Sequence, residues 1–153
     1  MNRYAMHHVM DSCYCFPVSK DEIVLRLRSA RGDLVSAKVL YESKYIIGLT
    51  QKSAKMTCAY QTELYDFFEV KLKLEDTRLG YVFCVSDGKD DYYFSEDGVT
   101  ENYDFSLGFY NFFQYPYIND ADIMPCVSWM KKAVFYQIFV DRFCRGDFKK
   151  DDS

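Results

Sequence analysis

The sequence predicts an all-β protein, an antiparallel β-sandwich, on three observations. Its 153 residues include 14 Tyr and 13 Phe and are 49% hydrophobic, which is enough apolar surface to bury the core of one domain. Apolar and polar residues alternate with a period of two in several short segments, and no window has the 3.6-residue period of an amphipathic helix. Turn residues separate the segments about every 10 positions, which is typical of two antiparallel sheets packed face to face.

The first half of the chain carries three predicted strands. Residues 21–29 place apolar side chains on one face and two arginines on the other, and residues 34–41 alternate in the same way. Arg31-Gly32-Asp33 between them predicts a turn. Residues 54–60 alternate Met, Cys and Tyr with Lys and Thr, which predicts the third strand.

The second half continues the pattern with three more strands. Residues 66–74 and 79–85 alternate large apolar side chains with charged or small ones. Asp87-Gly88 predicts a hairpin turn into a strand at 92–94, and Glu96-Asp97-Gly98 predicts another turn.

The pattern changes near residue 118. Residues 133–140 form a nearly continuous apolar run, which predicts a strand buried on both faces, as in a parallel sheet covered by helices. In a sandwich each sheet has one face in solvent, so its strands alternate and a continuous apolar run is not expected. We therefore expect a β-sandwich domain over residues 1–122, followed by a linker and the truncated start of a second domain over residues 123–153.

Charge and hydropathy exclude several classes of function. The net charge of −4 argues against nucleic acid, because binding phosphate requires a basic face. No apolar run is long enough for a membrane helix, and the first 20 residues lack the apolar region of a signal peptide, so a cytoplasmic location is expected. The six cysteines are expected to be buried thiols. Of the adjacent His7 and His8, one is expected to be packed and the other exposed.

Residues 129–147, WMKKAVFYQIFVDRFCRGD, resemble the entry into the catalytic barrel of the α-amylase superfamily. The preceding segments resemble the N-terminal β-sandwich, classed as a starch-binding module, of neopullulanases, cyclomaltodextrinases and maltogenic amylases. The segments that carry this resemblance are Leu25-Arg26-Leu27-Arg28, Gly32-Asp33, Tyr41-x-x-x-Tyr45, Tyr65-Asp66-Phe67-Phe68, Tyr81-x-Phe83 and Tyr93-x-x-Glu96-x-Gly98.

The resemblance implies an immunoglobulin-like sandwich with a C-terminal stub of a (β/α)8 barrel. It also implies a noncatalytic domain of an intracellular α-glucan hydrolase that acts in carbohydrate metabolism. The expected partners are an α-glucan or cyclodextrin oligosaccharide and the catalytic barrels of its own and a partner subunit, in a homodimer. The family's catalytic carboxylates come from later barrel strands, so no catalytic residue is expected in this chain.

No cofactor or metal is expected. In many members of the family the loop after the first barrel strand binds calcium, and Asp147 and Asp151 match two of its oxygen donors. Arg145 and Lys150 stand where other donors would be, whereas calcium takes six to eight oxygens.

The candidate sugar-binding residues are Tyr45, Tyr41, Tyr92 and Tyr93, because a tyrosine offers an apolar ring and a polar tip. Tyr45 is preferred, since it lies in a loop-like segment that the resemblance places near the partner's active site. Family members usually have Trp at the positions of Ile47 and Phe68, which favours the alternative of a purely structural or dimerisation domain without sugar binding. Hydrolysis by this chain alone and an unrelated adhesion-type sandwich are disfavoured.

Overall fold

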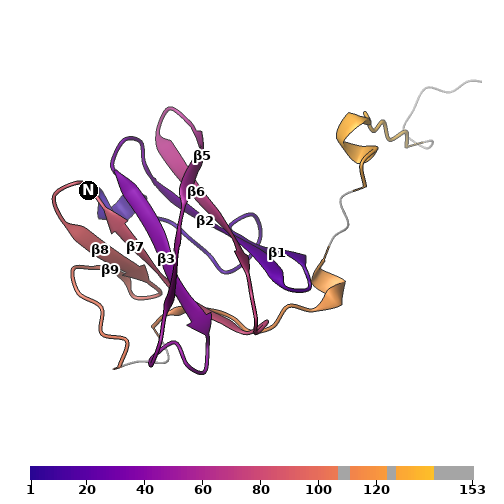
Figure 1. The fold of residues 1–153 in the computed structure, drawn as a ribbon. Helices are drawn as coiled ribbons and strands as arrows, with labels where there is room; N and C mark the ends of the chain where they lie inside the picture. Colours follow the sequence, from indigo (N-terminus) through magenta and orange to yellow (C-terminus); the bar gives the residue numbers. More distant parts are fainter. Residues whose placement is uncertain (107–110, 124–126, 140–153) are drawn as a thin grey trace, which may run out of the picture.

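The computed structural model describes residues 1–106, 111–123 and 127–139. Two antiparallel sheets pack face to face as a sandwich (Figure 1). Within this part of the chain the smaller sheet has the order β1-β2-β6-β5, and the larger has the order β4-β3-β7-β8-β9, with β10 also paired to β7. The predicted all-β, antiparallel sandwich is confirmed.

The strands have the following bounds: β1 Cys15–Ser19, β2 Glu22–Ala30, β3 Ser36–Ser43, β4 Lys52–Lys55, β5 Thr57–Gln61, β6 Tyr65–Lys73, β7 Leu79–Ser86, β8 Asp91–Ser95, β9 Gly98–Thr100 and β10 Phe113–Tyr115. Three short 3-10 helices are η1 Arg3–Ala5, η2 Asp120–Asp122 and η3 Met130–Lys132. The predicted strands at 21–29, 34–41, 66–74, 79–85 and 92–94 are confirmed with small changes at their ends, whereas β1, β9 and β10 were not predicted.

Alternation along the strands builds the core between the sheets. In the β2–β6 pair, Leu27 lies opposite Phe68 and both side chains are buried, while the neighbouring pair of Arg28 and Phe67 lies on the outer face. Strand β7 differs, since its residues 79–85 are buried on both of its faces. The largest fully buried side chains of the inter-sheet core come from β2, β3 and β7: Ile23, Leu25, Leu27, Val39, Leu79, Tyr81, Phe83 and Val85.

The predicted single strand at 54–60 is wrong in one respect. The segment divides at Met56 into β4, which pairs with β3 in the larger sheet, and β5, which pairs with β6 in the smaller sheet. The Met56 side chain is buried in the core, and its backbone N–H donates to the Ala37 carbonyl (2.9 Å). A period-two pattern continues through such a crossing, so it does not reveal the change of sheet.

Residues 133–139 do not form the predicted strand. They have no regular secondary structure, and Val134, Phe135 and Tyr136 are exposed. A strand needs a neighbour to pair its backbone groups, and no strand lies beside this segment in the described part of the chain. Val140, Asp147 and Asp151 lie outside the described residues.

The expectation of buried thiols is correct for only part of the described cysteines. Cys15 and Cys84 are buried, and desolvation raises the thiol pKa of Cys15 to about 12. Cys13 and Cys58 are exposed free thiols, because they lie before β1 and on the edge strand β5, where neighbouring strands do not cover them.

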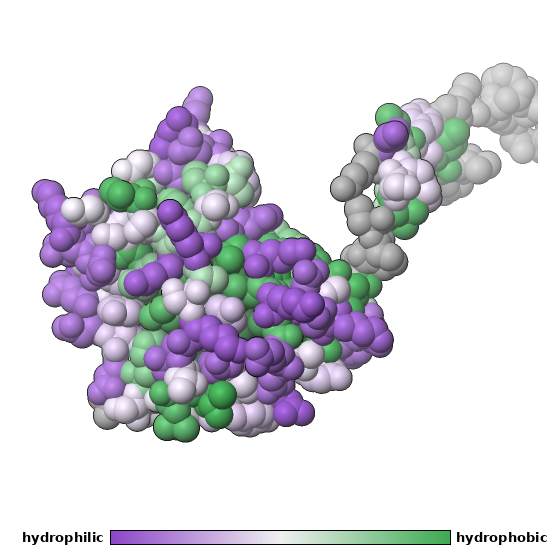
Figure 2. Space-filling view, in the orientation of Figure 1, coloured by the Kyte–Doolittle hydropathy of each residue, from purple (hydrophilic) through white to green (hydrophobic). Residues whose placement is uncertain are grey.

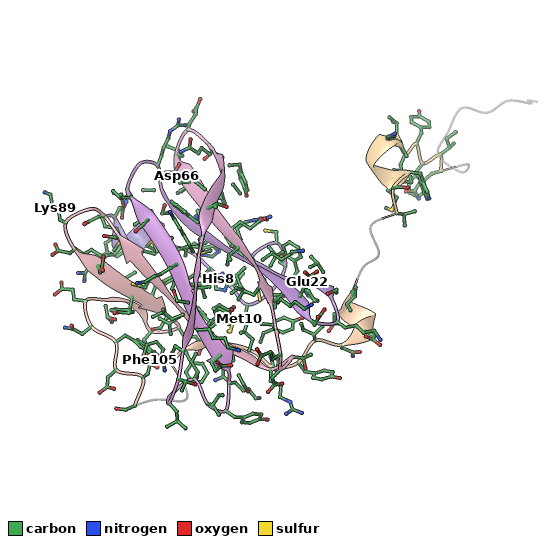
Figure 3. The ribbon with its side chains drawn as sticks, viewed as in Figure 1. His8, Met10, Glu22, Asp66, Lys89 and Phe105 are labelled. Atoms are coloured by element: carbon green, nitrogen blue, oxygen red, sulfur yellow. The ribbon has the colours of Figure 1, made fainter. Side chains whose placement is uncertain are left out.

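His8 lies in the middle of the sandwich (Figure 3) and is 6% exposed, as expected for one of the two histidines. Its Nδ1 is 2.8 Å from the Arg26 carbonyl oxygen, which can only accept, so Nδ1 carries the proton. Its Nε2 therefore accepts a hydrogen bond from the Tyr81 hydroxyl (2.8 Å). Desolvation lowers the pKa of His8 to about 4. The neighbouring His7 is half-buried rather than exposed.

Candidate functional site

Tyr45 is the most accessible of the four predicted tyrosines. It lies in the turn that follows β3, and its side chain is 58% exposed. The Lys44 ammonium lies 5.3 Å and the Arg78 guanidinium carbon 5.6 Å from the centre of its ring. An exposed ring with two cations beside it presents a π-surface together with charged hydrogen-bond donors.

Hydrogen bonds fix the start of the turn that carries Tyr45 to the loop before β7. The Lys44 N–H donates to the Arg78 carbonyl (3.0 Å), and the Ser43 hydroxyl donates to the Asp76 carboxylate (2.7 Å). The Arg78 N–H donates to the other oxygen of the same carboxylate (3.1 Å). The turn after β3 and the loop before β7 are therefore joined into one surface.

Further apolar side chains accompany Tyr45 on this turn. Ile46 is 42% and Leu49 is 80% exposed. Figure 2 shows hydrophobic residues gathered at the lower end of the sandwich, below the end of β3 in Figure 1. We call the surface formed by Tyr45, Ile46, Leu49 and Arg78 the β3 tip. An exposed apolar patch flanked by charges is typical of a binding surface.

A second apolar cluster anchors the β3 tip to the outer face of the larger sheet. Ile47 is fully buried against Val82 and Phe112, and Tyr93 packs against the same cluster. Gly80 of β7 makes room for this contact, because a Cβ at that position would lie 2.9 Å from the Phe112 ring and 3.2 Å from the Lys44 Cα. The cluster explains why β7 is buried on both faces.

Tyr93 therefore lies on the same outer face of the larger sheet as Ile47, and it is only partly exposed. Its ring stacks on the Tyr103 ring, with centroids 6.1 Å apart, and Tyr103 contacts Phe105 edge-on at 4.6 Å. Phe105 lies on the segment after β9, at the lower left of Figure 3. The Tyr103 hydroxyl donates to the Asn111 side-chain oxygen (2.7 Å), and desolvation raises its pKa to about 12.

The structure does not bring Tyr41 and Tyr92 to this face. Both are partly buried and pack against the inter-sheet core, because they follow the inward-facing positions of β3 and β8. Ile47 and Phe68, where the family usually has Trp, are also buried and offer no ring to a ligand. Ile46, Leu49 and Arg78 were missed by sequence reasoning, since isolated apolar or charged residues in a loop carry no periodic signal.

Charged side chains beside the β3 tip are joined in ion pairs. Among the described residues, no group of three or more His, Cys, Asp or Glu side chains is placed to hold a metal ion. Lys52 forms ion pairs with Glu75 (3.1 Å) and Glu42 (3.8 Å) beside the β3 tip, and its pKa is raised by the hydrogen bond to Glu75. No helix in the described part of the chain is long and apolar enough to cross a membrane.

Comparison of the sequence with models of known protein families shows which family the chain belongs to. The family model described as "Alpha amylase, N-terminal ig-like domain" matches residues 1–119. The chain belongs to this family. The predicted resemblance and the immunoglobulin-like architecture are therefore confirmed.

Curated relatives of this N-terminal Ig-like domain are α-glucan hydrolases. The chain is 32% identical to a cyclomaltodextrinase of Thermoanaerobacter pseudethanolicus, covering 99% of the chain and 26% of the relative. It is also 32% identical to neopullulanase 2 of Thermoactinomyces vulgaris, covering 96% of the chain and 25% of the relative. The chain thus spans about a quarter of the length of these relatives.

A solved cyclomaltodextrinase structure superposes on the whole Ig-like chain with a TM-score of 0.79 at 27% identity, and the match covers 26% of that structure. A maltogenic amylase structure from S. marinus superposes with a TM-score of 0.58 at 19% identity, which supports the fold alone.

Proposed function

We propose that this chain is the noncatalytic N-terminal domain of a cytoplasmic α-glucan hydrolase, and that the β3 tip contacts α-glucan or cyclodextrin. The observation that carries the proposal is the exposed Tyr45 ring, which has the Lys44 and Arg78 cations beside it. A pyranose ring stacks its C–H face on an aromatic side chain, while its hydroxyls pair with polar groups beside it. A Bacillus subtilis relative, named an intracellular maltogenic amylase, supports the cytoplasmic location.

A titration of the isotopically labelled chain with β-cyclodextrin and maltotriose tests the proposal. We expect the amide signals of residues 43–50 and of Arg78 to shift on addition of sugar. Tyr45→Ala removes the ring from the solvent side of the turn, where no described core residue depends on it, so the fold is retained and the shifts are lost.

Tyr4→Ala is the matched control. Tyr4 is 99% exposed and lies near the N-terminus, beside the loops at the other end of the sandwich. This variant loses the same side chain and should keep the shifts. A dispersed spectrum that stays unchanged up to roughly millimolar sugar, an affinity of only about −4 kcal/mol, would contradict sugar contact.

Subunit association is the second part of the proposal. Ile46 and Leu49 present apolar surface next to the charged residues of the β3 tip, a combination that suits a protein interface. In the whole enzyme, Leu49→Asp should raise the dimer dissociation constant, whereas Val35→Asp, at an equally exposed site near the opposite end, should not. Equilibrium sedimentation measures both, and equal effects would argue against this interface.

A purely structural role is the alternative that one observation favours. Tyr41 and Tyr92 are partly buried against the core, so two of the four predicted rings offer a ligand less surface than Tyr45 does. In that case the domain associates with the catalytic domains but binds no sugar, and Leu49→Asp has an effect while the titration has none.

A further inference from the structure

A hollow in the described surface lies on another side of the domain from the β3 tip. It has a volume of ≈ 530 Å³ and is formed by the segment leading into β1, by β1 itself, by β10 and by η2. Figure 1 shows η2 beside β1, where the ion pair of Lys20 and Asp120 (3.0 Å) joins them. This volume lies within the range of about 300–1,000 Å³ that small-molecule sites occupy.

The lining combines apolar rings with a few polar groups. Phe16, Pro17 and Tyr115 supply the apolar part, and Phe16 and Tyr115 are half-buried, so each is held by the fold and keeps an exposed part. Asp11 and Asp122 supply carboxylates from two segments far apart in the sequence. Such a mixture is typical of a site that recognises a partly apolar, hydroxylated molecule.

Both carboxylates lack a cationic partner in the described part of the chain. Asp11 accepts a hydrogen bond from the Ser12 N–H (2.5 Å), and Asp122 has no side-chain partner there, whereas Asp120 two positions earlier is paired with Lys20. Burial raises the pKa of Tyr115, and the charge of Asp122, which lines the same hollow, raises it further. The Tyr115 hydroxyl therefore stays protonated at neutral pH.

The chemistry of these groups distinguishes between classes of ligand. A metal ion would find two carboxylates, too few for a calcium site, and an anion would be repelled by them. An ammonium or guanidinium group could pair with both carboxylates, but it can only donate, so the hydroxyl protons of Ser12 and Tyr115 would then donate to water rather than to the ligand. A sugar hydroxyl both donates and accepts, and so it pairs with carboxylates and hydroxyls together.

We propose that the hollow between β1 and η2 is a second α-glucan site, in which a glucose unit packs on Phe16 and Tyr115 and donates hydrogen bonds to Asp11 and Asp122. The inference takes its ligand class from the proposed function and therefore rests on it, but it places that ligand at different residues.

Titration of the labelled 153-residue chain with maltotriose tests the site. We expect the amide signals of residues 11–17, 115 and 120–122 to shift in a saturable way. Asp122→Ala should weaken this binding about tenfold, as loss of a hydrogen bond to a charged group does. Glu63→Ala, which removes an exposed carboxylate in the loop between β5 and β6 and outside the hollow, should leave it unchanged.

The outcomes separate the two proposals. Shifts confined to residues 43–50 would overturn the second site and leave the β3 tip supported, whereas shifts confined to the hollow would do the reverse. An unchanged spectrum would contradict sugar binding at both places. Equal binding by the Asp122→Ala and Glu63→Ala variants, or saturation of the hollow by arginine amide but not by maltotriose, would also overturn the second site.

Discussion

Acidification should destabilise the sandwich through one buried side chain, His8. In the folded protein desolvation lowers its pKa to about 4, against 6.5 when it is unfolded. The unfolded state therefore binds a proton that the folded state does not, and stability falls as the pH drops below 6.5. At pH 5 the His8 ring is protonated when unfolded but mostly neutral when folded. Between pH 6.5 and pH 5 the free energy of unfolding therefore falls by about 1.36 kcal/mol for each of about 1.5 pH units, or about 2 kcal/mol in all.

Urea unfolding at pH 7 and at pH 5 measures this effect. His8→Gln does not titrate, and its amide oxygen can still accept from the Tyr81 hydroxyl. The variant has its own stability cost, but its difference between the two pH values should be smaller than that of the unchanged chain by about 2 kcal/mol. The pKa of Asp76 is lowered by its hydrogen bond with Ser43, and that of Asp87 by backbone N–H groups, so their contributions are lost only near and below pH 4.

The same pH dependence in the unchanged chain and in His8→Gln would refute the reasoning, because it would show that another group takes up the proton. His7→Gln is the matched control. The pKa of His7 is lowered by desolvation and by Arg28, but this ring is only half-buried, so its removal should change the pH dependence less than the removal of His8.

Three further predictions concern stability. Gly80→Ala should lower the free energy of unfolding by about 1–3 kcal/mol, because the added Cβ would collide with Phe112 and the Lys44 backbone beneath the β3 tip. Calorimetry measures the unfolding midpoint, and an unchanged midpoint would contradict the packing described. Asp66 accepts from the Gly32 N–H and from Gln61 (both 2.7 Å), so Asp66→Ala should cost about 2 kcal/mol and Asp66→Asn less, by urea unfolding. A chain ending after residue 123 should have a free energy of unfolding within about 0.5 kcal/mol of that of the full chain, because residues 127–139 do not pack against the core and Ile123, which does, is kept.

The sequence predicted the sandwich well because alternation reports burial directly. Leu25 and Leu27 must face inward if Arg26 and Arg28 face water, and the structure agrees. Prediction from the sequence failed where an element has no periodic signal. Strand β10 has only three residues, and its Phe113 joins the core from a segment without alternation.

The candidate site was predictable only in part. Tyr45 was favoured because it lies in a loop-like segment, and it is exposed. The sequence could not show that Tyr41 and Tyr92 face the core while Tyr93 faces outward, because that depends on the register with β7. Likewise, Asp11 and Asp122 meet at one hollow only through the closure of the fold, over a separation that no local pattern reports.

The crossing at Met56 has a consequence for cooperativity. A single segment, residues 52–61, forms an outer strand of both sheets, β4 in one and β5 in the other. If Met56 leaves the core, neither half of this segment keeps its anchor, so the two sheets cannot fray independently at this side of the molecule. Amide hydrogen exchange in β4 and β5 should then follow one common opening event, because this segment couples the opening of the two sheets.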